Sequence, residues 1–276
     1  MIRPRNSSTK LISKGAKLMI LICFYIITLN GQDTNIWNGK KCAVSLTYDD
    51  ALNVHLDNVV PLLDSLGFRA TFYIAGSFPG VQPRLADWKN AAGKGNELGN
   101  HTLFHPCEGG YPGREWVKPE YDLNTYTMRR MVDEIETANS LLSAIDGKTK
   151  RTFAYPCGET MIGDSSYVPV VNEKFVGARG GAGQKLQTID EIDVYGVCAF
   201  SVADQFADEL IGLVKKAVEK NALLVFVFHG VGGEHSINVP LEVHNKLISY
   251  LKQNENEIWV APMVEITEYI KEFRQN

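Results

Sequence analysis

Apolar runs alternate with segments of helical periodicity from residue 42 to the C-terminus. Runs rich in β-branched, aromatic and other apolar residues predict strands over 42–48, 70–75, 152–155, 222–228 and 258–261. A further short strand, leading into a loop, is expected over 97–102. Apolar residues spaced three and four apart predict helices over 57–66, 84–95, 128–142, 210–220, 241–252 and 262–273. Glycine- and proline-rich segments predict loops over 106–124 and 177–183.

The alternation predicts an α/β fold. Strands that are apolar throughout indicate a parallel sheet whose outer face is covered by helices. About seven such strand–helix units suit a barrel, so residues 32–276 are expected to form a single barrel-like domain. In such a fold the functional groups lie where the strands end and the loops begin.

Residues 1–31 have a different character. The first 17 residues hold five basic side chains and no acidic one, and the run 18–29 is apolar except for Thr28. A membrane-spanning helix needs about 17–25 apolar residues, so this run is too short to be one. It predicts a signal peptide cleaved near Gly31, with an uncleaved anchor as the alternative, and therefore an exported protein: periplasmic, secreted or associated with the cell envelope.

Charge and cysteine content narrow the classes of partner. Without residues 1–31 the chain keeps 28 − 5 = 23 basic and 32 acidic side chains, a formal charge of −9. Such an acidic surface suits neither nucleic acid nor an anionic membrane, and no membrane embedding is expected beyond the N-terminal segment. The even number of remaining cysteines permits disulfides, but free buried thiols are an equal alternative to one bridge: Cys42, Cys107, Cys157 and Cys198.

Titratable residues gather at three predicted strand ends. Asp49 and Asp50 would repel each other unless a cation lies nearby, although a solvated helix cap would also explain the pair. The spacing of His101 and His105 would put both imidazoles on one side of a helical turn, where they could share a metal; ordinary core or loop histidines are the alternative. His229 could be a general acid or base, or could simply cap its strand. Together, one carboxylate and two histidines with an open fourth position match a catalytic zinc site.

These motifs, in this order, carry a family resemblance. Thr-Tyr-Asp-Asp at 47–50, His-x3-His at 101–105 and an apolar strand ending in His-Gly at 229–230 resemble the polysaccharide deacetylase family (the NodB homology domain, carbohydrate esterase family 4). The resemblance extends over about 42–273. It implies a deformed (β/α) barrel that removes acetyl groups from a carbohydrate.

The resemblance also implies roles for single residues. Asp50, His101 and His105 would hold a divalent metal, usually Zn²⁺. Water on that metal would attack the acetyl carbonyl, with Asp49 as base and His229 as acid. A backbone N–H near Cys157, in the segment that begins at Tyr155, would complete an oxyanion hole.

The sequence departs from the family pattern at two places. The third motif has Ala154 where the family has an arginine that orients the catalytic aspartate. Arg179, flanked by glycines, is the candidate to replace it, with Arg151 as second choice and a surface position for Arg179 as the equal alternative. The fourth motif, an Asp–Trp pair, is not found, since Asp193 and Asp204 have no accompanying tryptophan, and the group that positions the acid stays open.

Other aromatic and imidazole groups have no motif partner. Loop aromatics could stack on sugars or pack on the domain, and packing is expected for two of three: Tyr111, Trp116 and Tyr121. Three histidines are expected to face solvent: His55, His235 and His244.

The leading hypothesis is therefore hydrolytic deacetylation of an exported glycan, with N-acetyl groups favoured over O-acetyl groups on the family resemblance. One alternative is an O-acetyl esterase of the acetylxylan type that uses the same site. Another is a catalytically impaired, glycan-binding member, which the two motif departures favour. A small-molecule C–N hydrolase is a third, and the export signal argues against it.

Overall fold

The computed structural model describes residues 1, 35–180 and 183–275. The chain divides into two units, Met1–Asp33 and Thr34–Asn276, and every element below belongs to the second. The predicted signal peptide lies outside the described residues, apart from Met1. Within the described part, no helix is both long and apolar enough to cross a bilayer.

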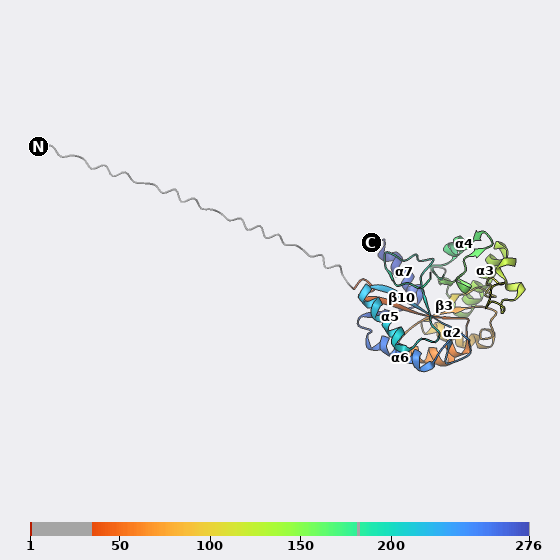
Figure 1. The fold of residues 1–276 in the computed structure, drawn as a ribbon, viewed down its shortest axis with the longest axis horizontal. Coiled ribbons are helices and arrows are strands. Elements are labelled where there is room, and N and C mark those ends of the chain that lie inside the picture. Colours follow the sequence, from red (N-terminus) through yellow and green to blue (C-terminus); the bar gives the residue numbers. More distant parts are fainter. Residues whose placement is uncertain (2–34, 181–182, 276) are drawn as a thin grey trace. The chain divides into compact units, whose positions relative to one another are not determined.

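One mostly parallel, curled sheet organises the domain and confirms the predicted α/β fold (Figure 1). Its strands follow the order β7-β4-β3-β2-β1-β10-β8, with β13 paired to β1 and β9 paired to β10. All of these pairs are parallel except β8 with β10. The strands of this sheet are β1 (Cys42–Asp49), β2 (Thr71–Ile74), β3 (Glu97–Asn100), β4 (Phe153–Ala154), β7 (Ala178–Arg179), β8 (Gln187–Thr188), β9 (Phe200–Ser201), β10 (Ala222–Phe228) and β13 (Ile258–Val260).

Helices cover the sheet, and two small strand pairs lie outside it. The helices are α1 (Val60–Leu66), α2 (Leu85–Gly93), α3 (Met128–Asp146), α4 (Val168–Lys174), α5 (Ala207–Lys220), α6 (Leu241–Gln253) and α7 (Met263–Phe273). The small pairs are β5 (Met161–Ile162) with β6 (Ser165–Ser166), and β11 (Gly230–Val231) with β12 (Asn238–Val239). A π-helical turn, His55–Val59, precedes α1. Short 3₁₀ turns occupy Gln82–Arg84, Pro119–Tyr121, Leu123–Thr125 and Pro156–Gly158.

Alternation along the central strands assigns side chains to the two faces of the sheet. Leu46 of β1 and Phe226 of β10 belong to the core that includes residues of α1, α2, α5 and α6. Ala43 and Val225 face the other way, into a core with α7. Figure 1 shows α5 close to β10, and α6 packs against α5. Both faces of β1 and β10 are therefore buried, which explains why these strands are apolar throughout.

Local signals explain the long helix α3. The Thr127 hydroxyl accepts a hydrogen bond from the Arg130 N–H (3.2 Å), and Gly147 ends the helix in the left-handed conformation with φ of 71°. Short elements were harder to predict. The segment 177–183, expected to be a loop, contains β7, and α4 was missed, because two-residue strands and two-turn helices leave little periodicity.

Candidate active site

Strand β1 delivers two carboxylates to the carboxyl end of the sheet. Asp49 is its last residue, and parity places Asp49 on the same face as Ala43, away from the layer that holds α1 and α6. Asp50 and Ala51 then adopt left-handed backbone conformations, with φ of 77° and 53°. Such conformations are costly for residues other than glycine and are often found at functional sites. Both aspartates are buried, with 4% and 5% of their surface exposed.

Arg179 of β7 holds Asp49. One guanidinium nitrogen, Nη2, donates to both carboxylate oxygens at 2.6 Å, and the guanidinium carbon lies 4.9 Å from the centre of the Tyr73 ring. Burial raises the pKa of Asp49, but the charge of Arg179 outweighs this, with help from His101 and His229, and lowers the pKa to about 2. The carboxylate is therefore ionised at neutral pH.

The second arginine considered for this role lies elsewhere. Arg151 is buried and pairs with Asp146 (3.2 Å), and it also donates to the Leu98 carbonyl. It supports the start of β4 and takes no part in the site. The structure thus places Arg179, and not Arg151, against the carboxylate.

Asp50, His101 and His105 converge on a common point. The Asp50 Oδ1 atom lies 3.9 Å from His101 Nε2 and 3.7 Å from His105 Nε2, and the ligand atoms of the three residues all lie within 4.8 Å of one another. The buried Oδ1 atom has no hydrogen-bond partner among the described residues. His101 Nδ1 contacts the Ala154 carbonyl at 2.8 Å, which places the ring proton on Nδ1 and leaves Nε2 with a free lone pair. Oxygen and imidazole donors so arranged fit a divalent transition metal such as Zn²⁺.

The two histidines meet through a loop and not through the expected helical turn. Thr102 and His105 have φ of 63° and 54°, and the Thr102 hydroxyl accepts from the His105 N–H (2.9 Å). The Asn100 side chain accepts from the Thr102 N–H (2.8 Å). This compact turn brings the two ring centres to 4.6 Å. Burial lowers the pKa of each imidazole to about 4 despite the nearby Asp49, so both are neutral, the form that binds metal.

A disulfide joins the loops of the second and third motifs. Cys107 and Cys157 are bonded to each other, while Cys42 and Cys198 are buried thiols that take no part in this disulfide. Because both sulfurs are in the bridge, they offer no thiolate to a metal next to His105. Cys157 adopts φ of 55° and lines a cavity of about 1020 Å³ that also contains the two aspartates; the oxyanion role of its backbone stays a prediction. The Tyr155 hydroxyl donates to the Tyr195 carbonyl (3.0 Å), so Tyr155 would contribute through its backbone or ring edge.

His229 follows β10 directly and enters the same cavity. Its carbonyl accepts a hydrogen bond from His55 Nε2 at 2.7 Å, and its buried Nδ1 has no partner in the part of the chain that the structure describes. Asp193 and Asp204 do not line the cavity, and Asp193 caps its own turn through the Tyr195 N–H. No carboxylate among the described residues therefore orients this ring.

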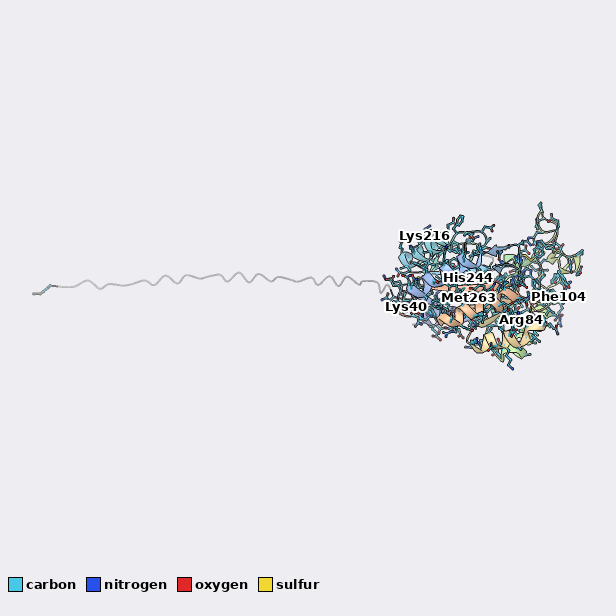
Figure 2. The ribbon with its side chains drawn as sticks, turned by 90° about the horizontal axis from the view of Figure 1, so that it is seen from below. Lys40, Arg84, Phe104, Lys216, His244 and Met263 are labelled. Atoms are coloured by element: carbon cyan, nitrogen blue, oxygen red, sulfur yellow. A yellow bond between two sulfur atoms is a disulfide. The ribbon has the colours of Figure 1, made fainter. Side chains whose placement is uncertain are left out.

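Three histidines expected to face solvent lie inside the domain or at the site. His55 supports the His229 carbonyl, and His244 of α6 bonds the Tyr48 hydroxyl (2.8 Å) within the domain (Figure 2). Both are fully buried. His235 stacks on His229 with ring centres 4.9 Å apart. The expectation was wrong for His55 and His244, because isolated histidines carry no period that reveals burial. His235 keeps 28% of its side chain exposed, but it also lies against the site.

One cavity of about 1020 Å³ is lined by the carboxylates, the arginine and four histidines of the site: Asp49, Asp50, Arg179, His101, His105, His229 and His235. Of the loop aromatics, Tyr121 stacks on Phe104 (5.1 Å), while Tyr111 and Trp116 are about half exposed. Packing of two of the three was therefore wrong. Trp116 lines the cavity, with its ring centre 6.3 Å from that of His105.

A curled, mostly parallel sheet that carries an arginine-held carboxylate beside an Asp–His–His group defines an α/β protein with a candidate metal site. Residues 38–170 match the family model described as polysaccharide deacetylase. By this match, the segment 38–170 belongs to the polysaccharide deacetylase family. The match includes Asp49, Asp50, His101, His105 and Cys157 and ends before Arg179 and His229.

One similar curated protein is the peptidoglycan-N-acetylmuramic acid deacetylase PdaA of Bacillus subtilis, 28% identical over 120 residues. The alignment covers 43% of this chain and 39% of that protein, so the chain spans less than half of its length.

Solved structures show the same fold at lower identity. A presumed polysaccharide deacetylase of Mycobacterium smegmatis has a TM-score of 0.61 at 13% identity, covering 86% of this chain and 92% of that one. A family 4 acetyl xylan esterase of Clostridium thermocellum, solved with a cobalt ion, has 0.53 at 16%, covering 82% and 90%. A family 4 pseudoenzyme of Bacillus anthracis has 0.51 at 20%, covering 83% and 66%.

Proposed function

We propose that this chain is a metal-dependent hydrolase that removes acetyl groups from a carbohydrate, with N-acetyl groups as the leading substrate and O-acetyl groups as the alternative. The observation that carries the proposal is the convergence of an ionised base, a three-residue donor set and an imidazole in one cavity. Asp50, His101 and His105 would hold the metal. A divalent ion bound there supplies a Lewis acid for the acetyl carbonyl and lowers the pKa of water towards about 7.

Asp49 and His229 then carry out the two proton transfers of the reaction. Asp49, kept ionised by Arg179, accepts a proton as water adds to the acetyl carbon. His229 donates a proton to the departing nitrogen or oxygen as its bond to that carbon breaks, which yields acetate and the free amine or alcohol. The backbone at Cys157 lines the same cavity and would donate to the developing oxyanion.

The lining of the cavity suits a neutral sugar. Trp116 presents a half-exposed ring near His105, and flat aromatic surfaces pack on the apolar faces of sugars. The acidic composition of residues 32–276 disfavours a polyanionic substrate. An acetylated glycan is therefore the proposed partner, and the N-terminal segment supports export to where such polymers occur.

Acetate release tests the proposal. We expect the Zn²⁺-loaded protein to release acetate from acetylated chito-oligosaccharides or from acetylxylan, and a chelator to stop it. Asp49→Asn should reduce turnover by at least about 100-fold while metal stays bound. Asp64→Asn, which alters an exposed pair with Lys94, is the matched control and should keep full activity. Release that persists after complete metal removal would contradict the mechanism.

One observation favours a second candidate, a glycan-binding protein with little activity. His229 Nδ1 has no hydrogen-bond partner among the described residues, so its tautomer is not imposed by a carboxylate. In that case acetylated oligosaccharides would bind, as measured by calorimetry, but the Zn²⁺-loaded protein would release no acetate.

A further inference from the structure

A short loop after β10 brings a further imidazole, that of His235, to the proposed metal site. His235 lies between β11 and β12, and its ring stacks on His229 at 4.9 Å with an angle of 22° between the planes. Its Nε2 atom lies 3.9 Å from Asp50 Oδ2. None of the motifs found in the sequence includes His235, yet it approaches both the acid and a metal-binding carboxylate.

Hydrogen bonds of Glu234 and a close backbone turn at Gly230 hold the loop that carries His235. The Glu234 carboxylate accepts from the Asn53 side chain (2.6 Å) and from the Val54 N–H (2.8 Å), which ties this loop to the segment after Asp50. Glu234 itself has φ of 68°. At Gly230 a side chain would come within 2.4 Å of the Gly233 carbonyl, so only glycine permits this turn. Two loops that carry site residues are thus fastened to each other next to His235.

Hydrogen bonding determines which ring nitrogen carries the proton. The Ile237 N–H donates to His235 Nδ1 at 2.9 Å. Nδ1 is therefore the acceptor, and the proton of the neutral ring is on Nε2, which faces Asp50 Oδ2. A protonated nitrogen is a donor and not a metal ligand. The other oxygen of Asp50, Oδ1, faces His101 and His105.

We propose that His235 is a positioning residue: its Nε2–H holds the outer oxygen of Asp50, so that the inner oxygen is directed at the metal, and its ring face orders the His229 ring. This inference rests on the metal site of the proposed function. The 3.9 Å separation is about 1 Å longer than a hydrogen bond, so the proposal requires the Asp50 carboxylate, whose Oδ1 has no hydrogen-bond partner in the described chain, to turn towards His235 when the metal binds. Mutation of a residue that hydrogen-bonds a metal-binding carboxylate typically weakens metal binding by about 10–100-fold.

Metal affinity of the full chain tests the role without any assay of turnover. The protein is stripped with a chelator, and its Zn²⁺ dissociation constant is measured by competition with a chromogenic chelator. His235→Phe keeps a flat ring on His229 but removes the N–H, and should weaken Zn²⁺ binding by about 10–100-fold. His235→Gln restores an N–H at the position of Nε2 and should lie within about threefold of wild type. Ser236→Ala, in the same loop, is the control and should bind as wild type does.

The outcomes separate this inference from the function on which it rests. If the wild-type chain takes up no Zn²⁺, the proposed function fails, and the inference with it. If wild type binds and His235→Phe binds equally well, or if His235→Gln is as weak as His235→Phe, only the inference fails. The visible spectrum of the Co²⁺ form should keep its shape in His235→Phe; a spectrum that reports a lost nitrogen ligand would make His235 a ligand and overturn the positioning role.

Discussion

Replacing Arg179 by methionine removes the guanidinium while filling much of the same space. The structure shows Nη2 donating to both oxygens of Asp49 at 2.6 Å, with 6% of Arg179 and 4% of Asp49 exposed. The variant therefore leaves a carboxylate in a buried position without its counter-charge. We expect a lower free energy of unfolding and a less effective general base at Asp49.

The size of the effect follows from the pKa of Asp49. Burial raises this pKa, but Arg179 and the neighbouring imidazoles lower it from 3.8 to about 2, which corresponds to about 2 kcal/mol in favour of the folded protein. Because the folded pKa is below the unfolded one, this contribution is present above pH 3.8 and is lost as the pH falls through about 2. Removing one partner of a buried pair costs about 3–5 kcal/mol. We expect Arg179→Met to lower the free energy of unfolding by about 2–5 kcal/mol at pH 7.

Urea unfolding in the presence of a chelator measures the loss of unfolding free energy in Arg179→Met without a contribution from bound metal. Asp49→Asn and the double variant complete a thermodynamic cycle, and the double variant should be more stable than the sum of the single effects by about 1–3 kcal/mol. Asp133→Asn breaks the exposed pair with Arg129 and should change stability by less than about 0.5 kcal/mol. Additive single effects, or a loss below about 0.5 kcal/mol in Arg179→Met, would refute the buried ion pair.

Other consequences can be checked separately. His101→Ala removes one of three donors from the proposed metal site and should abolish stoichiometric Zn²⁺ binding in equilibrium dialysis; retained stoichiometry would exclude His101 as a ligand. Converting Cys107 and Cys157 to serine opens a link between residues 50 positions apart and should cost about 4 kcal/mol in urea unfolding, whereas unchanged stability would show that the loop needs no bridge. Burial lowers the pKa of His244 to about 4, so the unfolded chain binds a proton first as the pH falls from 6.5, and stability should decrease by about 1.4 kcal/mol per pH unit from this group. His244→Gln should reduce the slope of unfolding free energy against pH by that amount between pH 6 and 5, and an unaltered slope would argue against a buried neutral imidazole.

The central strands were predictable because their chemistry is repeated over many residues. For 222–228 the expected strand and β10 have the same bounds, and the helix expected over 241–252 ends one residue later in α6. Long periodic elements carry enough apolar positions to reveal themselves. The edge strands β7, β8 and β9 have two residues each, and their existence depends on pairing with neighbours distant in sequence. A sequence contains no local signal for such pairs.

Site residues were predictable where a motif linked them, and not where tertiary contacts created the role. Asp50, His101 and His105 do come together, although a loop with residues of positive φ performs what a helical turn was expected to do. His55 and His235 belong to none of the motifs. His55 Nε2 donates to the His229 carbonyl and His235 Nε2 lies 3.9 Å from Asp50 Oδ2. Both contacts join segments far apart in the sequence, which meet only after β1 and β10 have paired.

The position of Arg179 explains how the chain departs from its family motif and keeps the ion pair. In the register of the sheet, Ala154 of β4 is the direct neighbour of Arg179 of β7. Adjacent strands lie about 4.8 Å apart, so a long side chain on the next strand, at the same level, can reach the carboxylate that an arginine at 154 would reach. The missing motif arginine therefore no longer counts in favour of an impaired, glycan-binding member. The remaining argument for such a member is His229: its ring stacks on His235, and its backbone carbonyl accepts from His55, but no carboxylate among the described residues orients the ring. Stacking fixes the plane of an imidazole but not its tautomer, so the distinction between enzyme and binder depends on whether His229 can carry its proton on the nitrogen that faces the substrate.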